Sequence, residues 1–253
     1  MFAALALAVA SRRAAAAPIV RTVPYRAQAA LVFGLFRFTL NGVMEDEVDR
    51  AAGRYRVRLA GEGLGVKSTF ESTGVIRNGR FAPTATRLRF DIRTRQNRTD
   101  ITYDHDGRVA HYEHRGETFF LGRVRTGRNT VAVPEGEVVD DFASVVLNHG
   151  AGLFDPPGKV TRVLVLNRAR RRGEGLDDVD ADGTRGALLP LSISYVPDPD
   201  GAGTVSTVDV SGLSAWAKAD DPPKFTFTAD RQIERIEAPL ALGTSVRVTF
   251  IRQ

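Results

Sequence analysis

The chain has 253 residues, of which 43% are hydrophobic and 26% are charged, the balance of a soluble globular protein. It has no cysteine, which excludes disulfides, thiolate metal sites and a cysteine nucleophile. The formal net charge is only +5, so the composition does not indicate a nucleic-acid-binding protein.

The N-terminus has the features of an export signal. Phe2 to Ala10 is an apolar run as long as the core of a signal peptide and too short to cross a bilayer. Small-residue cleavage patterns occur at the end of this run, at 8–10, and again at 15–17, although no Lys or Arg precedes the apolar run. A buried first helix or strand is the alternative. We predict a signal peptide over 1–17 and a periplasmic mature protein. Cleavage would remove Arg12 and Arg13, two of the 35 basic residues. The mature chain would then have 33 basic and 30 acidic residues and a net charge of +3.

Apolar and polar residues then alternate along several short segments. Such a period of two is typical of strands with one buried and one solvated face, which form antiparallel sheets. Val163 to Leu166 is apolar at every position and predicts a fully buried strand. No later apolar stretch approaches the roughly 18 residues of a membrane-spanning helix. The alternating segments are 36–41, 55–59, 88–93, 225–227 and 246–250.

Turn signals punctuate these segments at short intervals. Asn-Gly and Asp-Gly favour tight hairpins, because both residues tolerate a positive φ. The fold class predicted is all-β, an antiparallel meander forming a curved sheet or open barrel. We expect a single β-rich domain over 18–253, with possible halves at 18–134 and 159–253. The turn signals are Asn78-Gly79, Asp106-Gly107, Pro156-Pro157-Gly158, Asp182-Gly183 and Asp200-Gly201.

Arginines occupy the polar positions of the early strands. Neighbouring strands would gather them on one positive face, and the arginine fork binds phosphate and carboxylate groups in a bidentate way. The alternative is a solvated face balanced by Glu62, Glu71 and Asp91. The arginines on this expected face are Arg56, Arg58, Arg87, Arg89, Arg93 and Arg95.

Three histidines, His105, His111 and His114, invite a metal hypothesis. On a strand, His111 and His114 point to opposite faces and cannot share an ion. His105 and His111 could meet across the hairpin, but we favour exposed or hydrogen-bonded histidines and predict no metal. No nucleophile elbow, phosphate-binding loop or zinc-protease helix occurs, so we assign no catalytic residue and no cofactor.

A short helix is predicted near 140–149. Asp140 and Asp141 suit its N-terminus, and Asn148-His149-Gly150 is typical of a C-terminal cap. Phe142, Val145 and Val146 would share one face. We expect that face to pack on the sheet, and the alternative is that it lines a ligand site.

The acidic segment Leu176 to Gly186 resembles the start of a calcium loop. Asp178, Asp180, Asp182 and Gly183 match its positions 1, 3, 5 and 6, but position 12 is Leu189 rather than a bidentate carboxylate. We therefore predict an acidic hairpin, which could pair with the basic run 168–172.

Four segments stand in a distinctive order along the chain: Gly53-Arg54-Tyr55, Asn78 to Pro83, Ile101 to Gly107 and Asp140 to Ser144. Their order resembles an exported bacterial family catalogued as domain of unknown function 3108. The resemblance spans Tyr25 to Arg168, with a looser echo over Pro239 to Phe250, and the insert at Gly173 to Gly186 departs from it. It implies a periplasmic, antiparallel, curved or barrel-like β protein and no catalytic residues.

Two functions remain open from the sequence. The first is a non-catalytic periplasmic envelope protein that binds an apolar or anionic amphiphilic ligand, such as a lipid or glycan. Its candidate ligand-binding residues are Arg56, Arg58, Arg87, Arg89 and Phe142. The fourteen phenylalanines could line an apolar concavity or simply fill the core. The second is a hydrolase of envelope lipid or glycan, because four histidines still permit a Ser-His-Asp set formed in space.

Overall fold

The computed structural model describes residues 17–31, 33–118, 120–154, 158–168, 174–175, 178–179, 185–213, 217–218 and 220–252. The predicted signal peptide therefore lies outside the described residues, except for Ala17. No helix in the described segments is long and apolar enough to cross a membrane.

Within these segments, fifteen strands form one curved sheet, which confirms the predicted all-β fold class. Neighbouring strands are antiparallel, except for the parallel pair β9–β10. The strands are β1 (Ile19–Leu31), β2 (Phe36–Asp49), β3 (Arg54–Gly63), β4 (Val66–Arg77), β5 (Arg80–Ile92), β6 (Arg95–Asp104), β7 (Val109–Glu117), β8 (Val124–Ala132), β9 (Val139–Asp140), β10 (Val160–Arg168), β11 (Gly186–Pro197), β12 (Thr204–Val208), β13 (Lys224–Phe227), β14 (Ile233–Pro239) and β15 (Ser245–Phe250).

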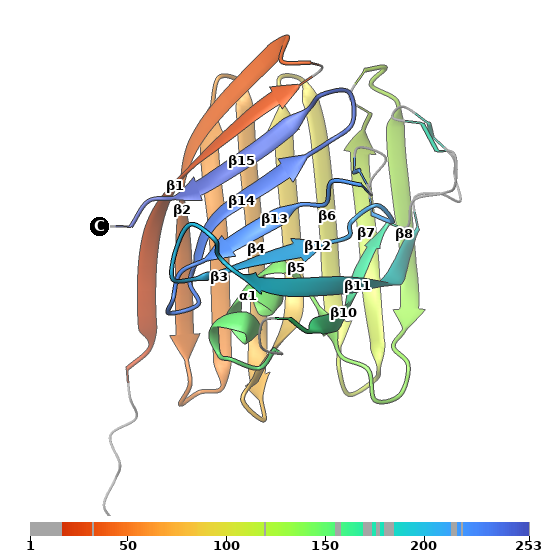
Figure 1. The fold of residues 1–253 in the computed structure, drawn as a ribbon. Coiled ribbons are helices and arrows are strands. Elements are labelled where there is room, and N and C mark those ends of the chain that lie inside the picture. The colour runs from red at the N-terminus through yellow and green to blue at the C-terminus, as the bar shows by residue number, and fades with distance from the viewer. Residues whose placement is uncertain are drawn as a thin grey trace, which may run out of the picture.

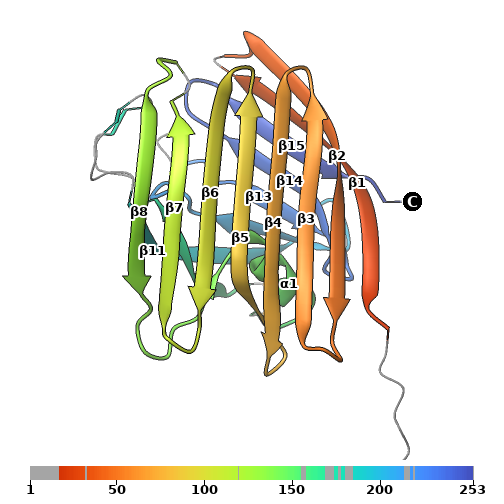
Figure 2. The same ribbon diagram turned by 180° about the vertical axis from the view of Figure 1, so that it is seen from behind.

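The sheet folds back on itself to form two layers. Strands β1 to β8 make a wall of long strands, and β10 to β15 cross over its concave side (Figures 1 and 2). Hydrogen bonds between β1 and β15, from Tyr25 opposite Phe250 to Ala30 opposite Ser245, join the layers along one side. The single domain over 18–253 and its possible halves, 18–134 and 159–253, stay predictions.

The other side of the fold is held by side chains. The Asn129 amide on β8 donates to the Gly186 carbonyl of β11 at 2.9 Å and accepts from the Gly186 N–H at 2.9 Å. This pair of bonds mimics a sheet ladder between β8 and the opposite layer. The edge strand β8 is therefore held against β11 of the opposite layer by a side chain rather than by strand pairing.

Two of the predicted turns that lie within the described residues have the expected chemistry. Asn78 and Gly79 have φ of 51° and 80° between the paired Arg77 and Arg80, a two-residue hairpin of the predicted kind. In the hairpin between β6 and β7, the Asp104 carboxylate accepts from the N–H groups of Asp106 and Gly107, at 3.1 and 2.7 Å. Asp182-Gly183 and most of Pro156-Pro157-Gly158 lie outside the described residues.

One α-helix, α1 (Phe142–Gly150), packs between the layers. Asp141 is its N-cap: its carboxylate accepts from the Ser144 N–H at 2.8 Å, and the Ser144 hydroxyl accepts from the Asp141 N–H at 2.9 Å. The predicted start is confirmed. The predicted C-terminal cap was wrong, because Asn148 and His149 are helical and buried, the helix ends at Gly150, and its C-cap is Ala151.

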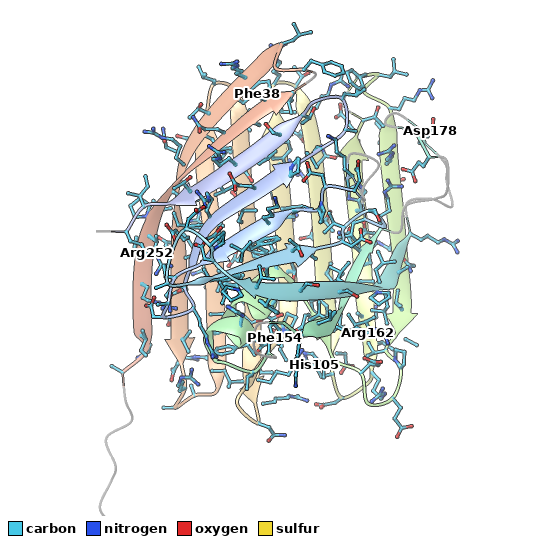
Figure 3. The ribbon with its side chains drawn as sticks, viewed as in Figure 1. Phe38, His105, Phe154, Arg162, Asp178 and Arg252 are labelled. Atoms are coloured by element: carbon cyan, nitrogen blue, oxygen red, sulfur yellow. The ribbon has the colours of Figure 1, made fainter. Side chains whose placement is uncertain are left out.

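Strand β10 is close to the prediction for Val163 to Leu166. Val163, Leu164 and Leu166 are buried and Val165 is half-buried. They belong to two of the hydrophobic clusters between the layers. Side chains from both layers fill much of this space (Figure 3).

Candidate functional site

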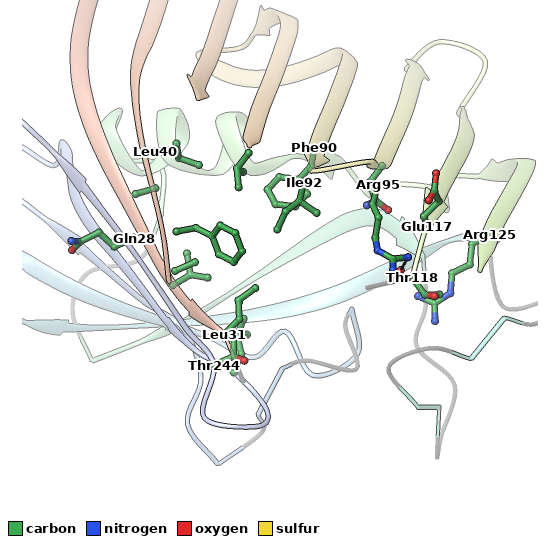
Figure 4. A pocket seen from close by; sticks show the side chains of 17 residues that line it. Gln28, Leu31, Leu40, Phe90, Ile92, Arg95, Glu117, Thr118, Arg125 and Thr244 are labelled. Atoms are coloured by element: carbon green, nitrogen blue, oxygen red, sulfur yellow. Dashed lines mark hydrogen bonds between the residues drawn. The ribbon is translucent and has the colours of Figure 1, made fainter. Parts of the chain in front are cut away.

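The concave side of the curled sheet, its inner face, contains two apolar cavities. The first, which we call the rim cavity, has a volume of about 350 Å³. Its apolar wall is formed mainly by Ala27, Ala29, Leu31, Phe38, Leu40, Val66, Phe90, Ile92, Leu240 and Val246 (Figure 4). The cavity lies near the hairpin that joins β1 to β2.

The rim cavity exists because small side chains stand where large ones would fill the space. Ala27 lies opposite Leu40 and Val248, and Ala29 lies opposite Phe38 and Val246. In a close-packed interior, apolar positions are filled by interdigitating side chains with few voids. Two alanines in alternate positions of β1 leave that space open.

One end of the rim cavity is polar and is lined by Arg95, Asn97, Glu117, Thr118 and Arg125 (Figure 4). The Arg95 guanidinium donates to the Thr118 and Phe120 carbonyls, at 2.9 and 3.0 Å. The Arg125 Nε donates to the Asp178 carbonyl at 2.8 Å. These arginines therefore hold the surrounding loops at the polar end of the rim cavity.

The inward position of Arg95 corrects the sequence analysis, which placed it on the solvated face. Ile92 pairs directly with Arg95 across a two-residue turn in which Arg93 has φ of 55°. Residues paired across such a turn share a face, so Arg95 lies on the inner face beside Ile92.

The second cavity, the core cavity, has a volume of about 280 Å³ and lies deeper between the layers. Phe142 of α1 forms part of its wall. Its ring packs edge-on against Phe70 of β4, with centroids 5.7 Å apart, and contacts Phe225 of β13 at 6.3 Å. Leu88 lines the core cavity and Phe90, two residues further along β5, lines the rim cavity. The apolar lining thus continues along one strand.

A buried carboxylate lies at the side of the core cavity. Asp140 is fully buried and forms an ion pair with Arg80. It also accepts from the Ser144 hydroxyl at 3.0 Å and the Asn148 amide at 3.3 Å. Burial raises the pKa of Asp140 to about 6, an effect that Arg80 and Ser144 oppose. These partners occupy the carboxylate, so its role is to hold the helix against the long wall.

Asn148 extends this connection to β5. Its amide accepts from the Phe81 N–H at 2.9 Å and donates to the Phe81 carbonyl at 3.0 Å. Next to it, His149 is buried and stacks on Tyr195, with centroids 4.9 Å apart. Burial, aided by the charge of Arg231, lowers the pKa of His149 to about 4. Sequence reasoning missed both roles.

The four arginines predicted to bind a ligand lie together on the convex side of the long wall, its outer face. Arg56 pairs with Glu71 at 2.9 Å, Arg58 with Glu45 at 3.4 Å, and Arg89 with Asp100 at 2.7 Å. Arg87 stands opposite Glu71 and Asp100 in the strand register. The structure therefore brings the arginines together with acids and separates them from Phe142, which faces the interior.

The histidines of 105–114 have separate partners. His105 Nε2 is 2.7 Å from the Pro83 carbonyl oxygen, His111 Nδ1 is 2.9 Å from the Thr130 hydroxyl, and His114 Nδ1 is 2.9 Å from the Thr99 hydroxyl. Among the described residues, no three metal-ligating side chains cluster and no histidine bonds to a serine. Asp180, Asp182 and Gly183 of the acidic segment lie outside the described residues, and Asp178 is exposed.

No family model and no curated protein matches the chain. Among solved structures, it is similar to the β-barrel-like protein of domain of unknown function DUF1849 from Brucella abortus. The sequence identity is 12% and the TM-score 0.45, over 91% of this chain and 95% of that chain. The resemblance to domain of unknown function 3108 was wrong, because no family model matches the chain. The segments that suggested it are short strand, hairpin and helix-start patterns.

Proposed function

We propose that the protein is a non-catalytic periplasmic envelope protein that holds the hydrocarbon chain of a single-chain amphiphile inside its curled sheet. The observation that carries this proposal is the rim cavity of about 350 Å³, apolar along its wall and polar at one end. Binding sites for small molecules are concave, mostly apolar and usually preformed.

The volume suits one chain. If a methylene group takes up about as much space as a water molecule, roughly 30 Å³, a cavity of about 350 Å³ accommodates about a dozen of them. Burial of each methylene contributes about 0.8 kcal/mol, so a chain of that length gains enough to offset its loss of freedom.

A cavity-filling substitution tests the proposal. Ala29→Phe would place a ring in the rim cavity, because Ala29 lies opposite Phe38 and Val246 on the inner face. Ala30→Phe is the matched control, since Ala30 lies opposite Arg37 and Ser245 on the other face. The probe is N-phenyl-1-naphthylamine, a neutral dye that fluoresces in apolar surroundings.

We expect the wild type and Ala30→Phe to bind the dye equally, and Ala29→Phe to bind it at least about tenfold more weakly. Thermal denaturation of the three proteins checks that each is folded. The proposal is contradicted if the folded wild type does not bind the dye, or if both substitutions weaken binding alike.

The location is tested separately. The N-terminal sequence of the protein recovered from the periplasm is expected to begin between Ser11 and Arg21. Recovery of the chain in the cytoplasm with an intact Met1 would contradict the periplasmic location and leave the cavity experiment unaffected.

A further inference from the structure

We propose that a third cavity, at the N-terminal end of β1, binds the anionic headgroup of a single-chain amphiphile whose chain lies in the core cavity, at a site separate from the rim cavity at the other end of β1. This inference goes beyond the proposed function, which concerns the rim cavity, and names the chemistry of a second ligand site: a phosphate or carboxylate joined to a single acyl or alkyl chain. We call it the mouth cavity. Its volume is about 200 Å³, and it lies between the start of β1, the end of β2, helix α1 and the turn before β14.

The charge of the mouth cavity is positive. Its charged lining consists of Arg21, Arg50, Arg231 and Asp46. Arg21 holds the buried Asp46 with two bonds, Nε to Oδ1 at 2.9 Å and Nη2 to Oδ2 at 2.8 Å. A third nitrogen of Arg21 donates to the Gln232 side chain at 2.7 Å. Arg21 is therefore fixed and its charge is neutralised by Asp46.

Arg50 and Arg231 remain without a counter-charge. Both are exposed, and within the described part of the chain neither side chain forms a hydrogen bond or ion pair. The Arg50 guanidinium lies 5.6 Å from the centre of the Phe81 ring, which holds it at the cavity. Each guanidinium keeps open donors, and the planar fork of a guanidinium binds a phosphate or a carboxylate in a bidentate way.

The acids next to these arginines in the sequence are bound elsewhere. Asp49 accepts from the Ala52 N–H at 2.8 Å and pairs with Arg54 at 3.4 Å. Asp230 accepts from the Thr228 hydroxyl. Neither of them lines the mouth cavity.

The floor of the mouth cavity is apolar and leads toward the interior. It includes Val48, Phe81 and Leu147 together with Phe142 and Val146, which also line the core cavity. A free anion would gain nothing from this floor, whereas an amphiphile places its charge on the arginines and its chain against Phe142. The combination of arginines and an apolar floor in the mouth cavity favours the amphiphile.

The test compares three probes by titration calorimetry below the critical micelle concentration. Dodecyl phosphate carries both parts of the proposed ligand, inorganic phosphate carries the anion alone, and N-phenyl-1-naphthylamine carries no charge. The variant is Arg50→Gln with Arg231→Gln. The matched control is Arg56→Gln with Arg58→Gln, two arginines of the outer face that already form ion pairs.

We expect the mouth variant to bind dodecyl phosphate at least about tenfold more weakly than the wild type does. The control variant and the neutral dye should each change by less than about twofold. Inorganic phosphate should bind far more weakly than dodecyl phosphate.

Three outcomes would overturn the inference: unchanged affinity of the mouth variant for dodecyl phosphate, an equal loss in the control variant, or equal binding of inorganic phosphate. The proposed function fails differently. In that case the wild type would not bind the neutral dye, whatever happens to the anionic probe.

Discussion

The two faces of the long wall are formed by the same alternating strands, but their side chains have different partners. On the outer face, arginines stand beside acids, as in the Arg56–Glu71 pair at 2.9 Å. On the inner face, Ala27 and Ala29 leave the rim cavity of about 350 Å³ open, and the core cavity of about 280 Å³ lies deeper between the layers. A row of arginines along a strand is thus largely neutralised by the acids of the neighbouring strands.

The contrast between Arg56 and Arg50 shows what makes an arginine available to a ligand. Arg56 lies within β3, where the neighbouring strands supply Glu47 opposite it and Glu71 as its ion-pair partner. Arg50 lies in the turn after β2, where no strand faces it, and its side chain rests on Phe81. The difference teaches that strand ends, rather than strand faces, supply unneutralised charge in this protein.

The largest effect on stability is expected on the inner side, at Asn148. Asn148→Ala removes both bonds to the backbone of Phe81 and leaves a buried N–H and a buried C=O without partners. At about 1–3 kcal/mol for each such group, we expect a loss of about 4 kcal/mol in urea denaturation. Asn41→Ala, on the outer face, is the control and should cost less than about 1 kcal/mol. Equal costs would remove the contrast between the two faces.

Phe142→Ala should have the next largest effect. The ring is half-buried against Phe70 and Phe225, so we expect a loss of about 3 kcal/mol, at the lower end for a buried aromatic residue. Denaturation of Phe33→Ala, whose ring is exposed, provides the comparison. A loss below about 1 kcal/mol with a fall in probe binding would instead make Phe142 part of the ligand wall alone.

His149 should make the inner side sensitive to acid. Because the folded pKa is lowered to about 4 from 6.5, the neutral form is favoured in the folded state. This contribution is complete above pH 6.5 and is lost as the pH falls toward 4. His149→Phe preserves the stacking on Tyr195 and removes an Nε2 that is buried without a partner in the described structure.

We therefore expect the wild type to lose about 1–2 kcal/mol more stability than His149→Phe between pH 7.5 and pH 5. Asp140 and His114 titrate in the same range but are present in both proteins, so the difference isolates His149. Parallel stability curves over this range would show that His149 is not the acid-sensitive group.

The smallest effect is expected on the outer face. Arg56→Gln breaks an exposed ion pair with Glu71 and should cost less than about 1 kcal/mol, with the loss shrinking further in high salt. Urea denaturation at low and high salt measures it. A cost above about 2 kcal/mol would show that the outer charges form a coupled network, and the contrast with the inner face would then be smaller than we infer.

Much of the local structure follows from short patterns. The alternation in Tyr55 to Leu59 predicted a strand with one buried face, Asn78-Gly79 predicted a tight hairpin, and Asp141 predicted the start of α1. Each depends on interactions within a few residues. The same logic failed for Arg95, because a two-residue turn resets which face the next residue occupies.

The sequence by itself determined the period of the strands, the turns and the helix N-cap, since these depend on neighbouring residues. Only the tertiary structure decided which elements meet. The space beside Ala27 and Ala29 is enclosed as a cavity only because β15 pairs with β1. Likewise, Arg21 bonds to Gln232, which is 211 residues away in the sequence. The closure of a curled sheet depends on the summed burial of both layers, and no local window contains that energy.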